Sequence, residues 1–277
     1  MTTAFRLLGK GAEPLPSIRT TEDWRRIGAP KGGDKQWKPL RSAYELASAW
    51  CGDGSAVGPP ADFVAMLTAH PLLRELVLTE GYAEHETPLR GERGGPRNHD
   101  LLLVGTAAAG KVVIGVEGKA DEQFDRPLRE RWHLAQRTLA SGAKTNWPAR
   151  LERLAPGLLG LEATASDGTL NPLLADVPYQ LMSALAGTLI EAEERNAQLA
   201  VLLVHVFTSS ATRDELVERN REVFADFVRR LASTPDAVVD DNHLYGPFAI
   251  PGGSATRIPS HIPVLVGELV TELGQLV

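Results

Sequence analysis

The chain has almost no cysteine and no long hydrophobic run. Cys51 is the one cysteine among 277 residues, which excludes an internal disulfide framework and a zinc cluster built from cysteines. No stretch of about 18 consecutive apolar residues occurs. Residues 1–10 lack the apolar core and cleavage site of a signal peptide. These absences predict a cytoplasmic protein without membrane contact.

Charge of one sign is not in large excess either. The chain has 29 Lys and Arg against 35 Asp and Glu, a net charge of −6, so its surface as a whole does not attract a polyanion. Residues 25–41 and 126–153 are nevertheless locally basic. Such runs are usually solvated faces. In the second run, Arg126, Arg129 and Arg131 are the candidates for contacts with nucleic-acid phosphates.

Two short apolar segments carry charged residues at one end. Asp100 opens the segment that runs to Val104, and Glu117-Gly118-Lys119 closes the segment that begins at Lys111. Apolar strands do not need carboxylates at their ends. Two carboxylates and an ammonium at one sheet edge can hold a divalent cation and a hydrolytic water.

The two segments read as strands of a hairpin, with Gly110 supplying the positive φ of the turn. If Gly105 opposes Val112, the numbers of opposed residues sum to 217, and Asp100 lies opposite Glu117. Lys119, two positions beyond Glu117, is then on the same face. A slip of one residue would separate the two acids, and the sequence permits either register.

The remaining patterns predict an α/β (α+β) fold, a mixed central sheet flanked by helices. Residues 1–58 are expected to form an irregular, helical N-terminal appendage and residues 59–277 the main domain, with one continuous domain as the alternative. The expected helices are 21–26, 41–50, 61–78 with a break near His70-Pro71, 126–141, 148–154, 177–194 and 211–232; the expected strands besides the hairpin are 81–89, at a sheet edge, 199–207 and 262–269; the expected loops include 90–97 and 233–261.

This order of elements resembles the PD-(D/E)XK nuclease superfamily, which has the restriction-endonuclease-like fold. The likeness runs from about residue 61 to about residue 207 and rests on the acid that opens the second strand, on Glu117-Gly118-Lys119, and on Tyr179-Gln180 in the later helix. More narrowly, the chain looks like an uncharacterised bacterial family placed in that superfamily. One departure is visible, since His99 stands where the motif has proline.

The resemblance implies a metal-dependent nuclease that cleaves phosphodiester bonds, with DNA expected ahead of RNA. Asp100, Glu117 and the backbone carbonyl of Gly118 would bind Mg²⁺ or Mn²⁺, Lys119 would act on the attacking water or the developing charge, and Gln180 would bind water or phosphate. A further acid from the preceding strand would be Glu80, Glu84 or Glu86, and the resemblance does not choose among them.

Two other interpretations remain open. The domain could bind nucleic acid or a protein partner, including a second copy of itself, with little or no catalysis. Alternatively, Asp100, Glu117 and Lys119 could form a structural ion-pair cluster. A basic lining beside the acids would favour either nucleic-acid function, and a sealed or acidic surface would favour the structural role.

Other residue types give weaker signals. His85, His99, His205 and His261 lack the spacing of metal ligands, and His205 lies in an apolar strand, which is typical of a core histidine. Ser209-Ser210 lacks the glycine pattern of a hydrolase nucleophile. The five tryptophans are expected mainly in the core.

Overall fold

The structure is a computed structural model that describes residues 4–30, 33, 36–52, 54, 57–89 and 95–273. Within these residues, one mixed sheet has seven strands in the order β1-β2-β3-β4-β5-β7-β6. The β1–β2, β4–β5 and β5–β7 pairs are parallel, and the β2–β3, β3–β4 and β6–β7 pairs are antiparallel. The strands are β1 Arg6–Leu8, β2 Val77–Thr87, β3 Arg97–Ala107, β4 Gly110–Lys119, β5 Leu199–Thr208, β6 His243–Phe248 and β7 Val264–Glu272.

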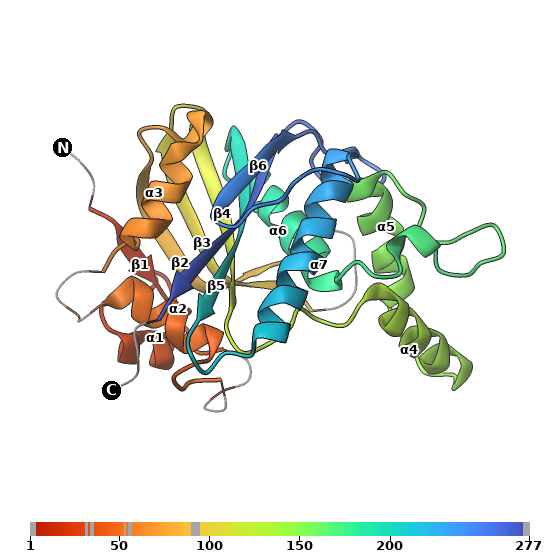
Figure 1. The fold of residues 1–277 in the computed structure, drawn as a ribbon, viewed down its shortest axis with the longest axis horizontal. Coiled ribbons are helices and arrows are strands. Elements are labelled where there is room, and N and C mark those ends of the chain that lie inside the picture. The colour runs from red at the N-terminus through yellow and green to blue at the C-terminus, as the bar shows by residue number, and fades with distance from the viewer. Residues whose placement is uncertain are drawn as a thin grey trace.

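Helices cover both faces of the sheet (Figure 1). The α-helices of the described residues are α1 Thr21–Ile27, α2 Ser42–Cys51, α3 Ala61–Ala69, α4 Leu128–Ala140, α5 Trp147–Leu159, α6 Tyr179–Glu194 and α7 Asp214–Ala232, with short 3₁₀ turns η2 Pro71–Leu73 and η3 Pro172–Leu174. One apolar core joins α1, α2 and α3 to one face, and another joins α4, α5, α6 and α7 to the other. The chain therefore has a mixed α/β fold of three layers.

The strands in the middle of the sheet are buried on both sides. Leu102 and Val104 belong to the core under α6, whereas Leu101 and Leu103 belong to the core under α2. Because β5 is covered on both faces, its sequence is continuously apolar instead of alternating. The crossover from β4 through α4, α5 and α6 to β5 returns the chain parallel to β4.

The predicted hairpin register is confirmed. Leu101 pairs with Val116 and Gly105 with Val112, so opposed positions sum to 217 as expected. Gly110 has φ +102° at the turn, a conformation that glycine adopts without steric cost. This register sends the charged ends of β3 and β4 to the same edge of the sheet.

Several predicted boundaries are wrong. β3 begins at Arg97, so Asp100 is its fourth residue and does not open the strand. The predicted break near His70-Pro71 is confirmed, because α3 ends at Ala69 and η2 follows, but no α-helix continues to residue 78, and β2 begins at Val77. In the described residues β1 pairs with only Glu80–Tyr82 on the outer side of β2, so the predicted edge position is wrong for those three residues alone. The predicted loop 233–261 contains β6. The sequence analysis missed two strands, β1 and β6. Both are short and lie in Gly/Pro-rich sequence, where alternation of apolar and polar residues gives no signal.

The N-terminal residues pack as part of the same core. Leu7, Trp24 and Trp50 are buried in the apolar cluster that also contains residues of β3, β4 and β5. Trp24, Trp50 and Trp132 are core residues, as the sequence predicted for most tryptophans. The predicted loop residues 90–94, and Lys31 and Lys35 of the first basic run, lie outside the described residues. No helix in the described part of the chain is long and apolar enough to cross a membrane.

Candidate active site

Three acids lie in a row across three adjacent strands. In the β2–β3 ladder the pairs Ala83–Leu101 and His85–His99 bracket Glu84 and Asp100. In the β3–β4 ladder the last pair before the acids is Leu101–Val116. Glu84, Asp100 and Glu117 are therefore at matching positions where the three strands meet the sheet edge.

The three acids face a hollow of about 460 Å³ that lies between the sheet edge and the start of α2. Lys119 and Gln180 share its wall with them, so four residues predicted from the sequence are brought together: Asp100, Glu117, Lys119 and Gln180. The wall also includes Gly118, Arg41, Ser42, Glu122 and Asp125.

Glu117 is buried and is held by three side chains. Its Oε1 accepts hydrogen bonds from Lys119 Nζ at 2.8 Å and from Gln180 Nε2, and its Oε2 accepts one from Arg97 Nη2. Burial alone would raise the pKa of Glu117, but the charges of Arg97 and Lys119 outweigh it and hold that pKa below its usual value. Glu117 is thus a carboxylate.

Lys119 is also buried, and its ammonium remains charged. Burial lowers the pKa of the Lys119 amine, whereas the carboxyl groups of Glu117 and Asp100 raise it and prevail. The ammonium also donates to the Gly118 carbonyl at 3.2 Å and lies 5.4 Å from the ring centroid of Phe124. Lys119 is therefore a fixed cation at the floor of the hollow.

Asp100 is held differently from Glu117. Its Oδ2 accepts a hydrogen bond of 2.8 Å from the backbone N–H of Gly118. Burial raises the pKa of Asp100 well above its usual value, and the neighbouring Glu117 and Glu84 raise it further. A cation bound beside Asp100 would therefore stabilise its charged form.

Glu84 is the acid that β2 contributes. It is buried and has φ +52°, a left-handed conformation that is uncommon for glutamate. Asn98 Nδ2 donates a 2.5 Å hydrogen bond to its Oε2. Glu80 instead contacts Arg6 and Tyr82, and Glu86 lies 3.7 Å from Lys10. The structure therefore places Glu84, of the three candidates, at the hollow.

Gln180 links the acids to the loop before α4. Its Nε2 donates to Glu117, and its Oε1 accepts from the backbone N–H of Asp125 at 3.2 Å. These two bonds fix which way the amide points. The resemblance predicted that this glutamine binds water or phosphate; the fold brings it to the end of β4, where its amide bonds Glu117 and Asp125.

The three candidate phosphate-binding arginines lie beside the hollow along the start of α4. Arg126 is exposed. Arg129 forms an ion pair with Asp176, and Arg131 forms one with Asp125 at the wall of the hollow. The guanidinium of Arg131 also lies 5.4 Å from the ring centroid of Tyr179. Arg129 and Arg131 are thus partly neutralised, while Arg126 presents its charge to solvent.

The residues that bond Glu117 and Glu84 from the start of β3, Arg97 and Asn98, were missed from the sequence. Both lie just before Asp100 at the start of β3, and an arginine at a strand start gives no signal of its own. Their contacts with Glu117 and Glu84 depend on strand pairing. His99, between Asn98 and Asp100, is fully buried and has no hydrogen-bond partner on either ring nitrogen among the described residues. Burial holds the pKa of His99 well below its usual value.

The donor atoms at the hollow are hard oxygens. Across the part of the chain that the structure describes, no set of three or more His, Cys, Asp or Glu side chains is arranged to hold a metal ion. Mg²⁺ usually needs fewer protein ligands, since it binds one or two carboxylates together with water and substrate phosphate. Asp100, Glu117 and the Gly118 carbonyl fit that requirement by their chemistry.

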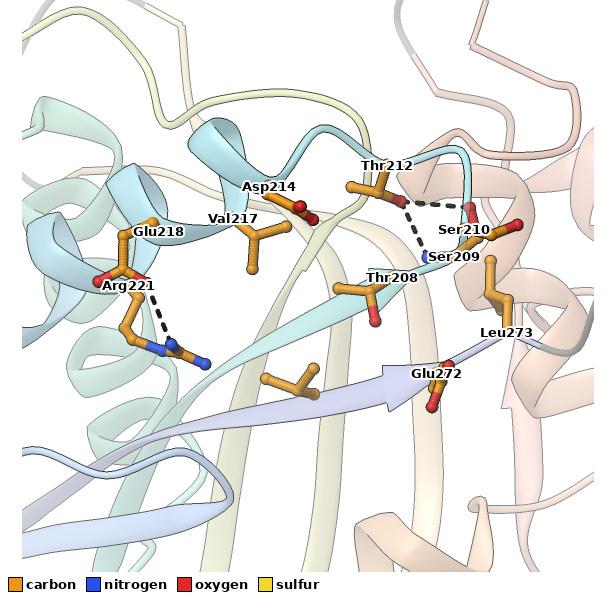
Figure 2. Close-up of a pocket in the computed structure, with 11 residues that line it drawn as sticks. Thr208, Ser209, Ser210, Thr212, Asp214, Val217, Glu218, Arg221, Glu272 and Leu273 are labelled. Carbon is orange, nitrogen blue, oxygen red and sulfur yellow. Dashed lines mark hydrogen bonds and ion pairs between the residues drawn. The ribbon is translucent and has the colours of Figure 1, made fainter.

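A second hollow, of about 690 Å³, lies where β5 and β7 end beside the start of α7 (Figure 2). Ser209 and Thr212 hydrogen-bond within the loop, with Ser209 N–H donating to Thr212 Oγ1 at 2.9 Å. Ala211 N–H donates to Ser209 Oγ at 3.2 Å. The hydroxyl of Ser209 therefore closes the turn before α7.

His205 lies in the core, as predicted. It is fully buried, and its Nε2 is 2.9 Å from Thr271 Oγ1. Burial lowers the pKa of His205 to about 4, so this imidazole is neutral.

The chain belongs to the family described as Domain of unknown function (DUF6946), whose model matches residues 17–269. The match crosses residue 58, where the sequence placed a boundary between appendage and main domain. No curated protein and no solved structure matches the chain.

Proposed function

We propose that this member of the DUF6946 family is a metal-dependent nuclease of the PD-(D/E)XK type, acting on DNA. The observation that carries the proposal is the convergence of Asp100, Glu117, Lys119 and Gln180 on one hollow at the ends of β3 and β4. The order β2-β3-β4, then helices, then β5 parallel to β4 supports it, because it is the order on which the resemblance rests. The proposal places the activity in the cytoplasm.

The protein groups have separate roles in phosphodiester hydrolysis. Asp100, Glu117 and the Gly118 carbonyl would hold Mg²⁺ or Mn²⁺. The bound ion would neutralise charge on the phosphoryl oxygens and lower the pKa of a water molecule. Lys119 would donate a hydrogen bond to the attacking water or to a phosphoryl oxygen, a contact that would strengthen as negative charge develops there. Gln180 keeps the Glu117 carboxylate oriented.

The nucleic acid is proposed to lie along the start of α4. Arg126 would contact a phosphate directly, because its charge is exposed. Arg129 and Arg131 would exchange their ion pairs with Asp176 and Asp125 for phosphate contacts, or assist from those pairs. Such contacts provide affinity without reading sequence.

A second candidate function is nucleic-acid binding with little or no catalysis. One observation favours the absence of catalysis: two cations, Arg97 and Lys119, already neutralise Glu117, as in the structural ion-pair cluster that the sequence left open. A carboxylate held by two protein cations attracts a metal ion less strongly than a free one. In that case the acids would organise the sheet edge, and binding would rest on the arginines.

The experiment that tests the proposal is a cleavage assay on single- and double-stranded DNA and RNA, with Mg²⁺, Mn²⁺ or EDTA. We expect metal-dependent cleavage by the wild-type protein and none by Lys119→Met, which keeps the aliphatic stem and removes the ammonium. Lys111→Met is the matched control, because Lys111 lies at the opposite end of the same strand. Cleavage in EDTA, or cleavage unchanged in Lys119→Met, would contradict the proposed site. Nucleic-acid binding without cleavage would favour the second candidate.

A further inference from the structure

Arg97 is a buried cation in direct contact with a proposed metal ligand. Its side chain is 9% exposed and Glu117 is 3% exposed, and Arg97 Nη2 donates to Glu117 Oε2. Arg97 begins β3, three residues before Asp100. Its charge is therefore located at the atoms where a divalent cation would bind.

The two carboxylate oxygens of Glu117 differ in how many hydrogen bonds they already accept. Each carboxylate oxygen has two lone pairs. Oε1 already accepts from Lys119 and Gln180, so both of its lone pairs are in use. Oε2 is the oxygen with a lone pair to offer, and Arg97 is bound to it. A cation that takes this lone pair would lie beside the Arg97 guanidinium, and the two positive charges would repel each other.

Arg97 is held less well than an arginine in a fully satisfied pair. Arg221 binds Asp241 through two nitrogens, Nε to Oδ1 at 2.8 Å and Nη2 to Oδ2. The buried Nε of Arg97, in contrast, has no hydrogen-bond partner among the described residues. A buried donor without a partner costs free energy, which makes the Arg97–Glu117 contact easier to exchange.

Packing against α6 holds the Arg97 stem in place. Gly187 lies over the stem, so closely that a Cβ at position 187 would be 3.0 Å from Arg97 Cγ. The absence of a side chain at Gly187 gives the stem its room. A change of partner would therefore involve the guanidinium end and not the packed stem.

We propose that Arg97 is a built-in competitor of the divalent cation: it neutralises Glu117 in the metal-free protein and leaves Oε2 when a cation binds. The inference rests on the proposed function, since it takes Glu117 to be a metal ligand. Competition of this kind is reciprocal, so the Arg97–Glu117 contact weakens metal binding by the same factor by which metal weakens the contact. Arg97 would set the cation concentration at which the site becomes active.

The test measures Mn²⁺ binding by calorimetry, and free Mn²⁺ by electron paramagnetic resonance, for the wild type, Arg97→Gln and Arg97→Met. We expect both variants to bind Mn²⁺ about 5- to 150-fold more tightly, the usual range of coupling between two linked events. Arg97→Gln keeps a hydrogen-bond donor for Glu117 and guards against misfolding of Arg97→Met. Affinity equal to or weaker than wild type in the folded variants would overturn the inference.

Thermal melting gives a second measurement, in which the Arg97 substitutions should have opposite effects without and with Mn²⁺. Without metal, the variants should melt at lower temperature than the wild type, because Glu117 loses a buried partner. Mn²⁺ should raise the melting temperature of the variants more than that of the wild type, because a ligand that binds more tightly stabilises the folded protein more. The matched control is Arg195→Gln, which breaks the ion pair of Arg195 with the buried Glu191 (2.7 Å). It should lower the melting temperature and leave Mn²⁺ affinity unchanged.

Glu117→Gln separates failure of this inference from failure of the proposed function. If Glu117→Gln loses Mn²⁺ binding while the Arg97 variants bind as the wild type does, Glu117 is a ligand and Arg97 is not its competitor. If Glu117→Gln binds Mn²⁺ as well as the wild type, Glu117 is not a ligand, and both proposals fall. Absence of Mn²⁺ binding in every variant would likewise overturn both.

Discussion

The carboxylate of Asp100 accepts a 2.8 Å hydrogen bond from the backbone N–H of Gly118, the residue between Glu117 and Lys119. This bond ties the start of β3 to the end of β4. It also holds Asp100 beside a second carboxylate, Glu117, in a buried setting that raises the pKa of Asp100. We expect this closeness of acids to cost stability, a relation common at functional sites.

Asp100→Asn tests that relation. The amide keeps an oxygen for the Gly118 N–H and removes the repulsion from Glu117 and Glu84, so we expect the metal-free protein to be more stable by about 0.5–2 kcal/mol. Mn²⁺ should no longer stabilise the variant. Urea unfolding with and without Mn²⁺ provides the measurement. A variant that Mn²⁺ stabilises as much as the wild type would show that Asp100 is not a ligand.

Gly187→Ala tests the packing behind the site. A Cβ at this position would be 2.6 Å from His99 Nε2 and 3.0 Å from Arg97 Cγ. Alanine normally favours a helix by about 1 kcal/mol over glycine, but overpacking costs about 1–3 kcal/mol, so we expect a net loss of stability. Gly58→Ala is the control, because nothing lies within 4 Å of a Cβ at Gly58. Equal unfolding midpoints for the two variants would refute the packing argument.

Glu268 should give the protein a stability that falls with rising pH. Burial raises the pKa of Glu268 from 4.5 to about 7, with a further contribution from Asp241. Between these values the folded protein binds more protons than the unfolded chain, so the free energy of unfolding decreases as pH rises through this window. The full destabilisation, about 3 kcal/mol, is present above pH 7.

Glu268→Gln should remove this contribution. Chemical unfolding at intervals from pH 5 to pH 8 should show that the free energy of unfolding of the variant increases relative to that of the wild type as pH rises. Glu272→Gln, at an exposed position of the same strand, should follow the wild-type profile. Parallel profiles for Glu268→Gln and the wild type would mean that the Glu268 pKa is not raised.

The arginines at the start of α4 should govern DNA affinity and its dependence on salt. Each phosphate contact contributes about −0.9 to the slope of log affinity against log salt concentration. We expect Arg126→Gln to reduce the steepness of that slope by about 1 without altering thermal stability, because Arg126 is exposed. Arg74→Gln is the control, since Arg74 lies beside the β3–β4 turn at the other end of the hairpin. Fluorescence anisotropy across a salt series provides the measurement, and equal slopes for the two variants would place the phosphates elsewhere.

The sequence by itself indicated the hairpin and permitted the register that unites the acids, and the strand pairing of the folded sheet selected that register. The apolar residues of β3 and β4 and the turn at Gly110 are local features, and once opposed positions sum to 217, the meeting of Asp100 and the Glu117-Gly118-Lys119 end follows from strand geometry. The long apolar run of β5 and the apolar helix α6 were likewise readable, because burial on all sides leaves a continuous hydrophobic signal.

Tertiary structure alone decided the rest of the site. The choice of Glu84 over Glu80 and Glu86 depends on the register of β2 against β3, which places Glu84 opposite Asp100. The pairing of Arg97 with Glu117 depends on two strand ends that meet in space and on the room that Gly187 leaves on α6. The short strands β1 and β6 gain their stability from neighbours distant in sequence. Local sequence sets propensity and periodicity, whereas these contacts exist because distant segments exclude water together.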